Sequence, residues 1–151
     1  RNYARPHLPD RVYGSVAIGR FISYVMEDGK IDVAEKIVYE AMDIIKKETG
    51  SEPLTTFDKA FENVTPLVEV GTRRIGGANY QVPREVRQER KFMLSARWII
   101  DAAVKKTGKP MANRLAEELI LASKNDGAAV KKKQDTHRMA EANRAFAHFA
   151  R

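Results

Sequence analysis

The sequence of 151 residues contains no cysteine. That absence excludes a disulfide scaffold, a cysteine-ligated zinc site and a thiol nucleophile, and it fits a reducing cytoplasm. No run of about 18 apolar residues occurs either, so we expect no membrane-spanning helix and no membrane partner. At this length the sequence favours a single domain that can bury a sizeable core.

Motifs for nucleotide chemistry and metal binding are also missing. Gly108-Lys109-Pro110 lacks the upstream glycine and the following Ser or Thr of a phosphate-binding loop. Gly76-Gly77 does not fit a dinucleotide fingerprint, because a strand rather than a helix is expected after it. His137 and His148 would lie roughly 16 Å apart on one helix, too far to share a metal. We therefore expect no catalytic residue, no cofactor and no metal site.

Positive charge is present in excess and is unevenly distributed along the chain. The formal net charge is +7. Residues 1–69 hold nine Lys/Arg and twelve Asp/Glu, whereas residues 70–151 hold eighteen and eight. A chain whose second half carries all the surplus positive charge favours a polyanionic partner. A basic domain that is merely soluble is the plainer alternative.

Helical periodicity dominates the sequence outside one segment. Apolar residues recur at helical spacing in six stretches, 15–28, 32–49, 53–65, 88–106, 110–125 and 135–149. Ser15 is expected to cap the first helix, and Asp32 with Glu35 resembles a capping box on the second. The expected buried faces include Val33, Val104, Met139, Phe146 and Phe149. Residues 1–14 are expected to form an extended basic arm, and residues 15–151 a single helical domain.

Residues 67–86 alternate with period two around Gly76-Gly77, which predicts one β-hairpin inserted into an otherwise all-α fold. This segment carries the cations Arg73, Arg74 and Arg84 and a central aromatic ring, Tyr80. Cations beside a ring that can stack on bases are typical of RNA-binding surfaces. The alternative is a structural wing that packs flat on the helices.

Further basic clusters lie outside the hairpin. They comprise Arg87, Arg90, Lys91 and Arg97 on the fourth helix, the loop lysines Lys131, Lys132 and Lys133, Arg138 and Arg144 on the last helix, and Lys30 after the first helix. Cations at a helix N-terminus oppose the macrodipole, which suggests an external anion, although a solvated face would look the same. Charge spread over separate patches favours a folded RNA over a linear duplex.

Several segments resemble one known family. Residues 69–83, reading Glu-Val-Gly-Thr-Arg-Arg-Ile-Gly-Gly-Ala-Asn-Tyr-Gln-Val-Pro, resemble the hairpin of the bacterial small-subunit ribosomal protein seven family. Residues 128–133 and 137–148 are similar to its C-terminal signature, and residues 28–30 and 96–98 also match. The resemblance extends from Leu8 to Phe149. It implies six helices with a β-ribbon between the third and the fourth.

The resemblance also implies a function. It indicates a structural constituent of the small ribosomal subunit, a primary binder of the three-prime major domain of ribosomal RNA that nucleates head assembly. It implies a cytoplasmic protein near the exit-site tRNA and the messenger path, beside small-subunit ribosomal proteins nine and eleven. RNA contact is implied at Lys30, Arg73, Arg74, Arg90, Lys91, Arg97, Lys131, Lys132, Lys133, Arg138 and Arg144. Judged from the residues alone, the rival is an architectural DNA-binding protein with a β-wing.

The sequence departs from the family pattern at three positions that bear on binding. Gly71 stands where a Lys or Arg is usual, which removes a charge and loosens the strand. Arg84 stands where an apolar residue is usual, which moves a charge to the second strand. Ile31 replaces a second Lys, which weakens the expected contact by the loop at Lys30.

Overall fold

A computed structural model describes residues 4–150 of the chain, so Arg1 and Arg151, at the ends of the predicted arm and domain, lie outside it. The elements run in the order α1 (Val16–Val25), α2 (Ile31–Thr49), α3 (Pro53–Val64), β1 (Val68–Ile75), β2 (Ala78–Glu85), α4 (Gln88–Lys105), α5 (Met111–Ser123), α6 (Ala128–Ala142) and the 3-10 helix η1 (Arg144–Ala150). The predicted class, all-α with one hairpin inserted between the third and fourth helices, is confirmed.

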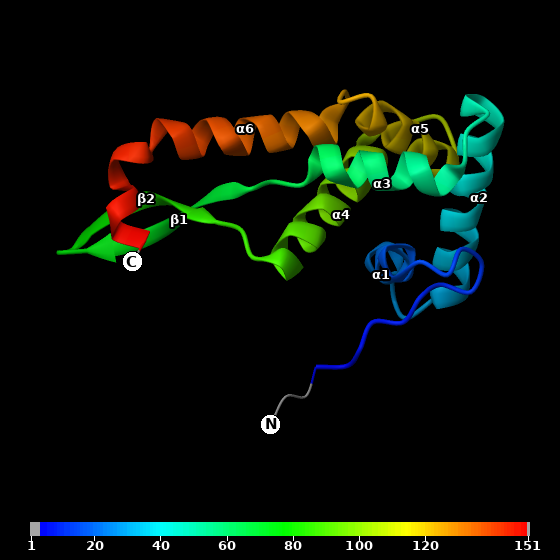
Figure 1. The fold of residues 1–151 in the computed structure, drawn as a ribbon, viewed down its shortest axis with the longest axis horizontal. Coiled ribbons are helices and arrows are strands. Elements are labelled where there is room, and N and C mark those ends of the chain that lie inside the picture. The colour runs from blue at the N-terminus through cyan, green and yellow to red at the C-terminus, as the bar shows by residue number, and fades with distance from the viewer. Residues whose placement is uncertain (1–3, 151) are drawn as a thin grey trace.

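Helices α1 to α5 gather into a helical body at one end of the molecule, and the hairpin extends from it to the other end (Figure 1). Helix α6 runs along the long axis from the body to the hairpin, and η1 then turns across the strands (Figure 1). None of the helices within residues 4–150 is long and apolar enough to cross a membrane.

The core of the body is built around aromatic rings. Phe21 contacts Phe57 and Phe61 at centroid distances of 5.5 and 5.6 Å, in the edge-on geometry that aromatic pairs prefer. These rings come from α1 and α3, whose apolar residues recur at helical spacing. The expected burial of Val33 and Val104 is wrong, since they are 53% and 56% exposed. Their helices turn neighbouring positions inward instead.

Helix ends follow the sequence only in part. Ser15 caps α1 as predicted, since its hydroxyl accepts the Ile18 N–H at 3.2 Å. Gly50 ends α2 in the left-handed conformation that glycine adopts most easily. The capping box at Asp32 is wrong, because α2 begins at Ile31 and Lys30 in the cap position makes no side-chain bond.

Helix α6 begins seven residues earlier than predicted, so the three lysines lie in its first turns and not in a loop. Ala129 and Val130 at its start are buried against the body. The buried carboxylate of Glu118 on α5 accepts the Ala129 N–H at 3.0 Å. The helix is therefore begun by a side-chain cap from the preceding helix, 11 residues upstream, which lies outside the positions that local capping patterns use.

The hairpin pairs its strands antiparallel around the turn at Gly76-Gly77, with Arg73 opposite Tyr80. Both glycines have positive φ, 59° and 83°, as tight two-residue hairpin turns require. The expected helical stripe of Met139, Phe146 and Phe149 is wrong. Met139 is exposed, α6 ends at Ala142, and both phenylalanines lie on η1 against the hairpin.

Candidate nucleic-acid interface

The residues predicted to bind RNA fall on three surfaces and one outlying position. The hairpin surface comprises Arg73, Arg74, Tyr80 and Arg84, and the helix-four surface Arg87, Arg90, Lys91 and Arg97. The helix-six surface comprises Lys131, Lys132, Lys133 and Arg138 on α6 together with Arg144, which begins η1 and is not on the last α-helix as predicted. All are exposed except Tyr80, Lys91 and Lys133, which are half-buried. Lys30 immediately precedes α2, and α2 lies at the end of the molecule away from the hairpin (Figure 1).

The hairpin surface and the helix-four surface meet at Glu69. Its side chain is buried, with only 9% exposed, and one oxygen, Oε1, accepts hydrogen bonds from two arginines. The donors are Arg84 Nε at 3.2 Å and Arg90 Nε at 2.6 Å. The hydrogen bond with Glu69 raises the pKa of Arg90 above its usual value. A buried carboxylate is costly without partners, and the partners of Glu69 are these two arginines. Glu69 therefore holds the guanidinium groups of Arg84 and Arg90 side by side.

Arg73 and Tyr80 lie opposite one another and both contact η1. The Arg73 guanidinium donates to the carbonyl oxygen of Phe149. The ring of Tyr80 lies 5.3 Å from that of Phe146 and 5.1 Å from that of Phe149. Part of the Tyr80 ring is therefore covered by protein, and its role in RNA binding stays a prediction. Arg74 is opposite Asn79 on the other face of the hairpin and is exposed.

On the helix-six surface three consecutive lysines lie in the first turns of α6, whose cap residue is Gly127 and whose Ala129 N–H is bound by Glu118. Positive charge there opposes the macrodipole. Arg138 pairs with Asp135 at 2.7 Å and Arg144 with Glu141 at 3.1 Å, both exposed. Such exposed pairs contribute little stability, so either arginine can exchange its partner for a phosphate at small cost.

His137 ties this helix to the start of the hairpin. Its Nε2 accepts the Leu67 N–H at 3.0 Å, which requires that nitrogen to be unprotonated. Burial lowers the pKa of His137, and the charge of Lys133 lowers it further. The neutral imidazole that the bond needs is thus the favoured form.

Two hollows border the start of α4. One, of about 460 Å³, lies against α1 and α3, and the other, of about 920 Å³, lies between the N-terminal segment, α1 and α4. Arg5, Arg20, Arg87 and Arg90 line the larger one. Neither Arg5 nor Arg20 was among the predicted site residues, because Arg5 lies in the predicted N-terminal arm and Arg20 lies within the apolar pattern of α1. Its guanidinium sits 4.2 Å from the centroid of the Phe92 ring, a cation–π contact.

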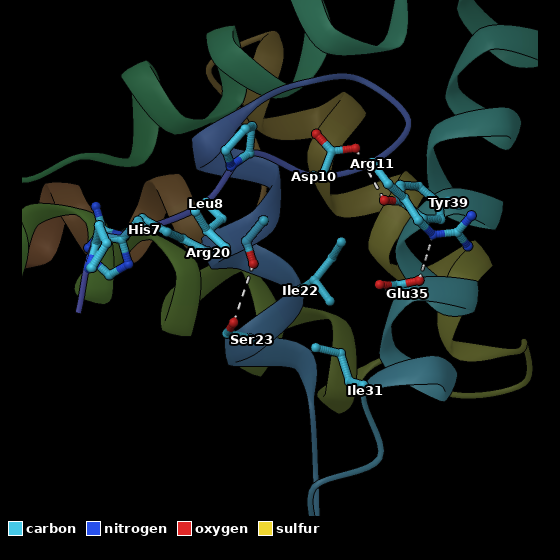
Figure 2. Close-up of a pocket in the computed structure, with 13 residues that line it drawn as sticks. His7, Leu8, Asp10, Arg11, Arg20, Ile22, Ser23, Ile31, Glu35 and Tyr39 are labelled. Carbon is cyan, nitrogen blue, oxygen red and sulfur yellow. Dashed lines mark hydrogen bonds and ion pairs between the residues drawn. The ribbon is translucent and has the colours of Figure 1, made fainter.

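Another hollow, of about 470 Å³, lies between the N-terminal segment, α1 and α2 (Figure 2). Asp10 accepts backbone N–H groups of residues 12, 13 and 15 and the Tyr39 hydroxyl. Arg11 and Glu35 pair at 3.0 Å. The acidic groups of this hollow are thus engaged in holding the N-terminal segment. Across residues 4–150, no three His, Cys, Asp or Glu side chains gather as a metal site would require.

Comparison with known proteins gives consistent matches along the chain. A family model described as "Ribosomal protein S7p/S5e" matches residues 1–144. "Small ribosomal subunit protein uS7" of Fervidobacterium nodosum is 55% identical over 151 residues, covering 99% of this chain and 97% of the relative. The protein of that name from Thermotoga maritima is 56% identical over 141 residues, covering 93% and 91%. The one from Caldanaerobacter subterraneus is 54% identical over 145 residues, covering 96% and 93%.

Proposed function

The chain belongs to the family of ribosomal protein S7p/S5e, and from that premise we propose that it binds small-subunit ribosomal RNA as a structural component. The observation that carries the proposal is that the hairpin, α4 and α6 each present exposed cations. Where the hairpin surface and the helix-four surface meet, two arginines are already fixed side by side by Glu69. The proposed role is placement of RNA without catalysis.

The proposed mechanism is neutralisation of converging RNA strands. Each lysine or arginine that meets a phosphate releases condensed counterions, which drives binding and makes it depend on salt. The surfaces lie on different elements along the molecule (Figure 1). A duplex reader presents one helix to a major groove, whereas this arrangement suits a folded RNA whose strands approach from several directions.

The finer proposal concerns the place of the chain in the ribosome. We propose that it binds the three-prime major domain and nucleates assembly of the subunit head, in the cytoplasm. The hairpin tip would lie near the exit-site tRNA and the messenger path, with small-subunit ribosomal proteins nine and eleven as neighbours. Crosslinking of the chain inside assembled small subunits tests this placement. Crosslinks confined to RNA and proteins of another domain would contradict it.

The binding itself is tested by competition. The chain is mixed with a labelled transcript of the three-prime major domain, and unlabelled competitors are added at fixed ionic strength. Excess duplex DNA is expected to displace the transcript poorly, and unlabelled transcript to displace it fully. Efficient displacement by duplex DNA would favour the architectural DNA-binding alternative. Fixed salt matters because both kinds of protein would show salt-dependent affinity.

A further inference from the structure

We propose that Arg84 and Arg90 form a clamp for one RNA phosphate, with Glu69 as its positioning residue and Gly71 as the gap that lets the clamp form. The inference rests on the proposed binding of RNA and identifies a phosphate site within it. Three independent features support it, namely the burial of Glu69, its shared oxygen and the space that Gly71 leaves open.

The first two features fix the clamp. Glu69 as a whole residue is 7% exposed, whereas the side chains of Arg84 and Arg90 are 53% and 42% exposed. Both arginines donate Nε to the same oxygen of Glu69, and Arg84 also approaches it with Nη2 at 3.2 Å. Within residues 4–150, the terminal nitrogens of Arg90 make no hydrogen bond with protein. Two cations against one anion leave a net positive charge at the surface, with donors to spare.

The third feature is the missing side chain at Gly71. A Cβ there would lie 3.0 Å from Arg84 Cζ and 3.1 Å from its Nη1. The guanidinium of Arg84 therefore lies across Gly71, in space that any other residue would fill. A small hollow of about 190 Å³ opens beside it, bordered also by Arg73. In the sequence Gly71 and Arg84 are two separate departures from the family pattern. In the fold, the missing side chain at Gly71 provides the space that the Arg84 guanidinium occupies.

The geometry selects a phosphate as the ligand. A planar guanidinium offers parallel N–H groups that match two phosphate oxygens, and an arginine held by a carboxylate loses less freedom when it binds. The partner proposed for this chain is a polymer of phosphodiesters, and its ribosomal RNA, tRNA or messenger could supply the group. The site therefore takes a phosphodiester, and the source is decided by experiment.

Glu69→Gln is the first test, because a positioning role of Glu69 and a simple effect of net charge predict opposite changes in the affinity for RNA. Removing an acid from an RNA-binding surface should strengthen binding if only net charge matters. If Glu69 positions the clamp, E69Q weakens binding of the three-prime major domain transcript roughly fivefold to tenfold, the scale of one ordinary hydrogen bond. The slope of log affinity against log salt also falls, by about 0.7 to 0.9 for each phosphate that the protein no longer neutralises.

Glu85→Gln is the matched control. It makes the same charge change on β2, at an exposed position with no ion pair within the described residues. E85Q is expected to bind the transcript as tightly as the unaltered chain or slightly more tightly. Equal weakening in E69Q and E85Q would overturn the clamp.

Gly71→Ala is the second test and leaves Glu69 and its hydrogen bond with Arg90 in place. The added methyl displaces the guanidinium of Arg84 from Glu69, a loss of stability that the preference of a strand for alanine over glycine offsets. G71A is expected to melt close to the unaltered chain yet to bind RNA about threefold more weakly. In an R84Q background the same change should have no further effect on binding. An equal effect of G71A with and without Arg84 would overturn the inference even if E69Q failed to fold.

The outcomes separate this inference from the proposed function. If the unaltered chain fails to bind the transcript, both fall. If it binds and neither E69Q nor G71A weakens binding, only the clamp falls. Repeating the measurements with deacylated tRNA and with a single-stranded oligoribonucleotide identifies the phosphate source as the probe whose binding E69Q weakens most.

Discussion

The helical body, α1 to α5, and the hairpin arm, β1, β2, η1 and the far half of α6, are held together differently. In the body, Phe21, Phe57 and Phe61 are buried and touch one another. In the hairpin the buried side chains are fewer, and the rings of Tyr80 and of η1 are only half-buried. The body is stabilised by removal of apolar surface from water, and the arm by strand pairing and a thin aromatic contact.

The two regions therefore contribute different properties: the body contributes most of the stability, and the arm carries positive charge at its surface. Because the body supplies the burial, the arm can keep its arginines at the surface. The exception is Glu69, whose burial fixes Arg84 of the arm and Arg90 of α4 and contributes no apolar area. Changes in the body should therefore alter stability first, and changes in the arm should alter RNA binding first.

Phe57→Ala should have the largest effect on stability. Phe57 is fully buried and contacts two other rings, so its truncation leaves a cavity. We expect a decrease of about 3–5 kcal/mol in the free energy of unfolding, measured by urea denaturation. A decrease below about 1 kcal/mol would mean that the body is not packed as described.

Asp10→Asn tests the attachment of the N-terminal segment to the body. Burial raises the pKa of Asp10, but hydrogen bonds from Tyr13, Ser15, Val12 and Tyr39 outweigh it, so the pKa lies below the usual 3.8. The carboxylate therefore stabilises the fold above pH 3.8, and this is lost as the pH falls through the lowered pKa. We expect D10N to cost about 1–2 kcal/mol at neutral pH.

The pH dependence supplies the control for Asp10. Urea denaturation of D10N and of the unaltered chain should converge as the medium is acidified below the lowered pKa, since both then carry a neutral group. A difference that stays constant through that acid range would show that Asp10 acts by shape and not by charge.

Replacing Phe146 and Phe149 together by alanine tests how much their contact with Tyr80 stabilises the arm. Their rings contact Tyr80 but remain half-exposed. We expect the free energy of unfolding to fall by about 1 kcal/mol, the scale of an aromatic pair, with faster hydrogen exchange confined to hairpin amides. Exchange that rises equally across the body would break the distinction between the two regions.

Changing Lys131, Lys132 and Lys133 to alanine should have the smallest effect on stability. Alanine favours helix and the lysines oppose the macrodipole, so stability should hold or rise by about a few tenths of a kcal/mol. The salt slope of transcript binding should fall by up to about 0.9 for each phosphate left without its lysine. Lys46 and Lys47 at the end of α2 are the matched control, and their replacement should leave the slope unchanged.

The body could be predicted from the sequence because each of its helices is specified by residues within the helix and at its ends. Apolar residues at helical spacing placed α1, α3 and α4 within a few residues, and Ser15 and Gly50 marked helix ends. Errors arose at the edges of the stripes. Val33 and Val104 lie on the margins of their helices, where a small rotation decides between core and solvent.

The arm could be predicted only in outline because its contacts join residues far apart in the chain. Gly76-Gly77 revealed the turn, but the rings of Phe146 and Phe149 that pack on Tyr80 follow it only after three further helices. Glu69, with a valine on either side, looks like an outward-facing residue of an alternating strand, so its burial beneath two arginines was missed. The candidate cations were recognisable by type, whereas their mutual placement required the fold.

The contact between Tyr80 and η1 also bears on the order in which the molecule folds. Phe146 and Phe149 follow Tyr80 at a long distance in the chain, and α4, α5 and α6 lie between them. Contacts this far apart in sequence close slowly, because a long loop must be ordered first. During synthesis the hairpin emerges well before its aromatic partners, while α1 to α3 can already associate. The closure of η1 on the hairpin is therefore expected to be a late step of folding, after α1 to α3 have associated.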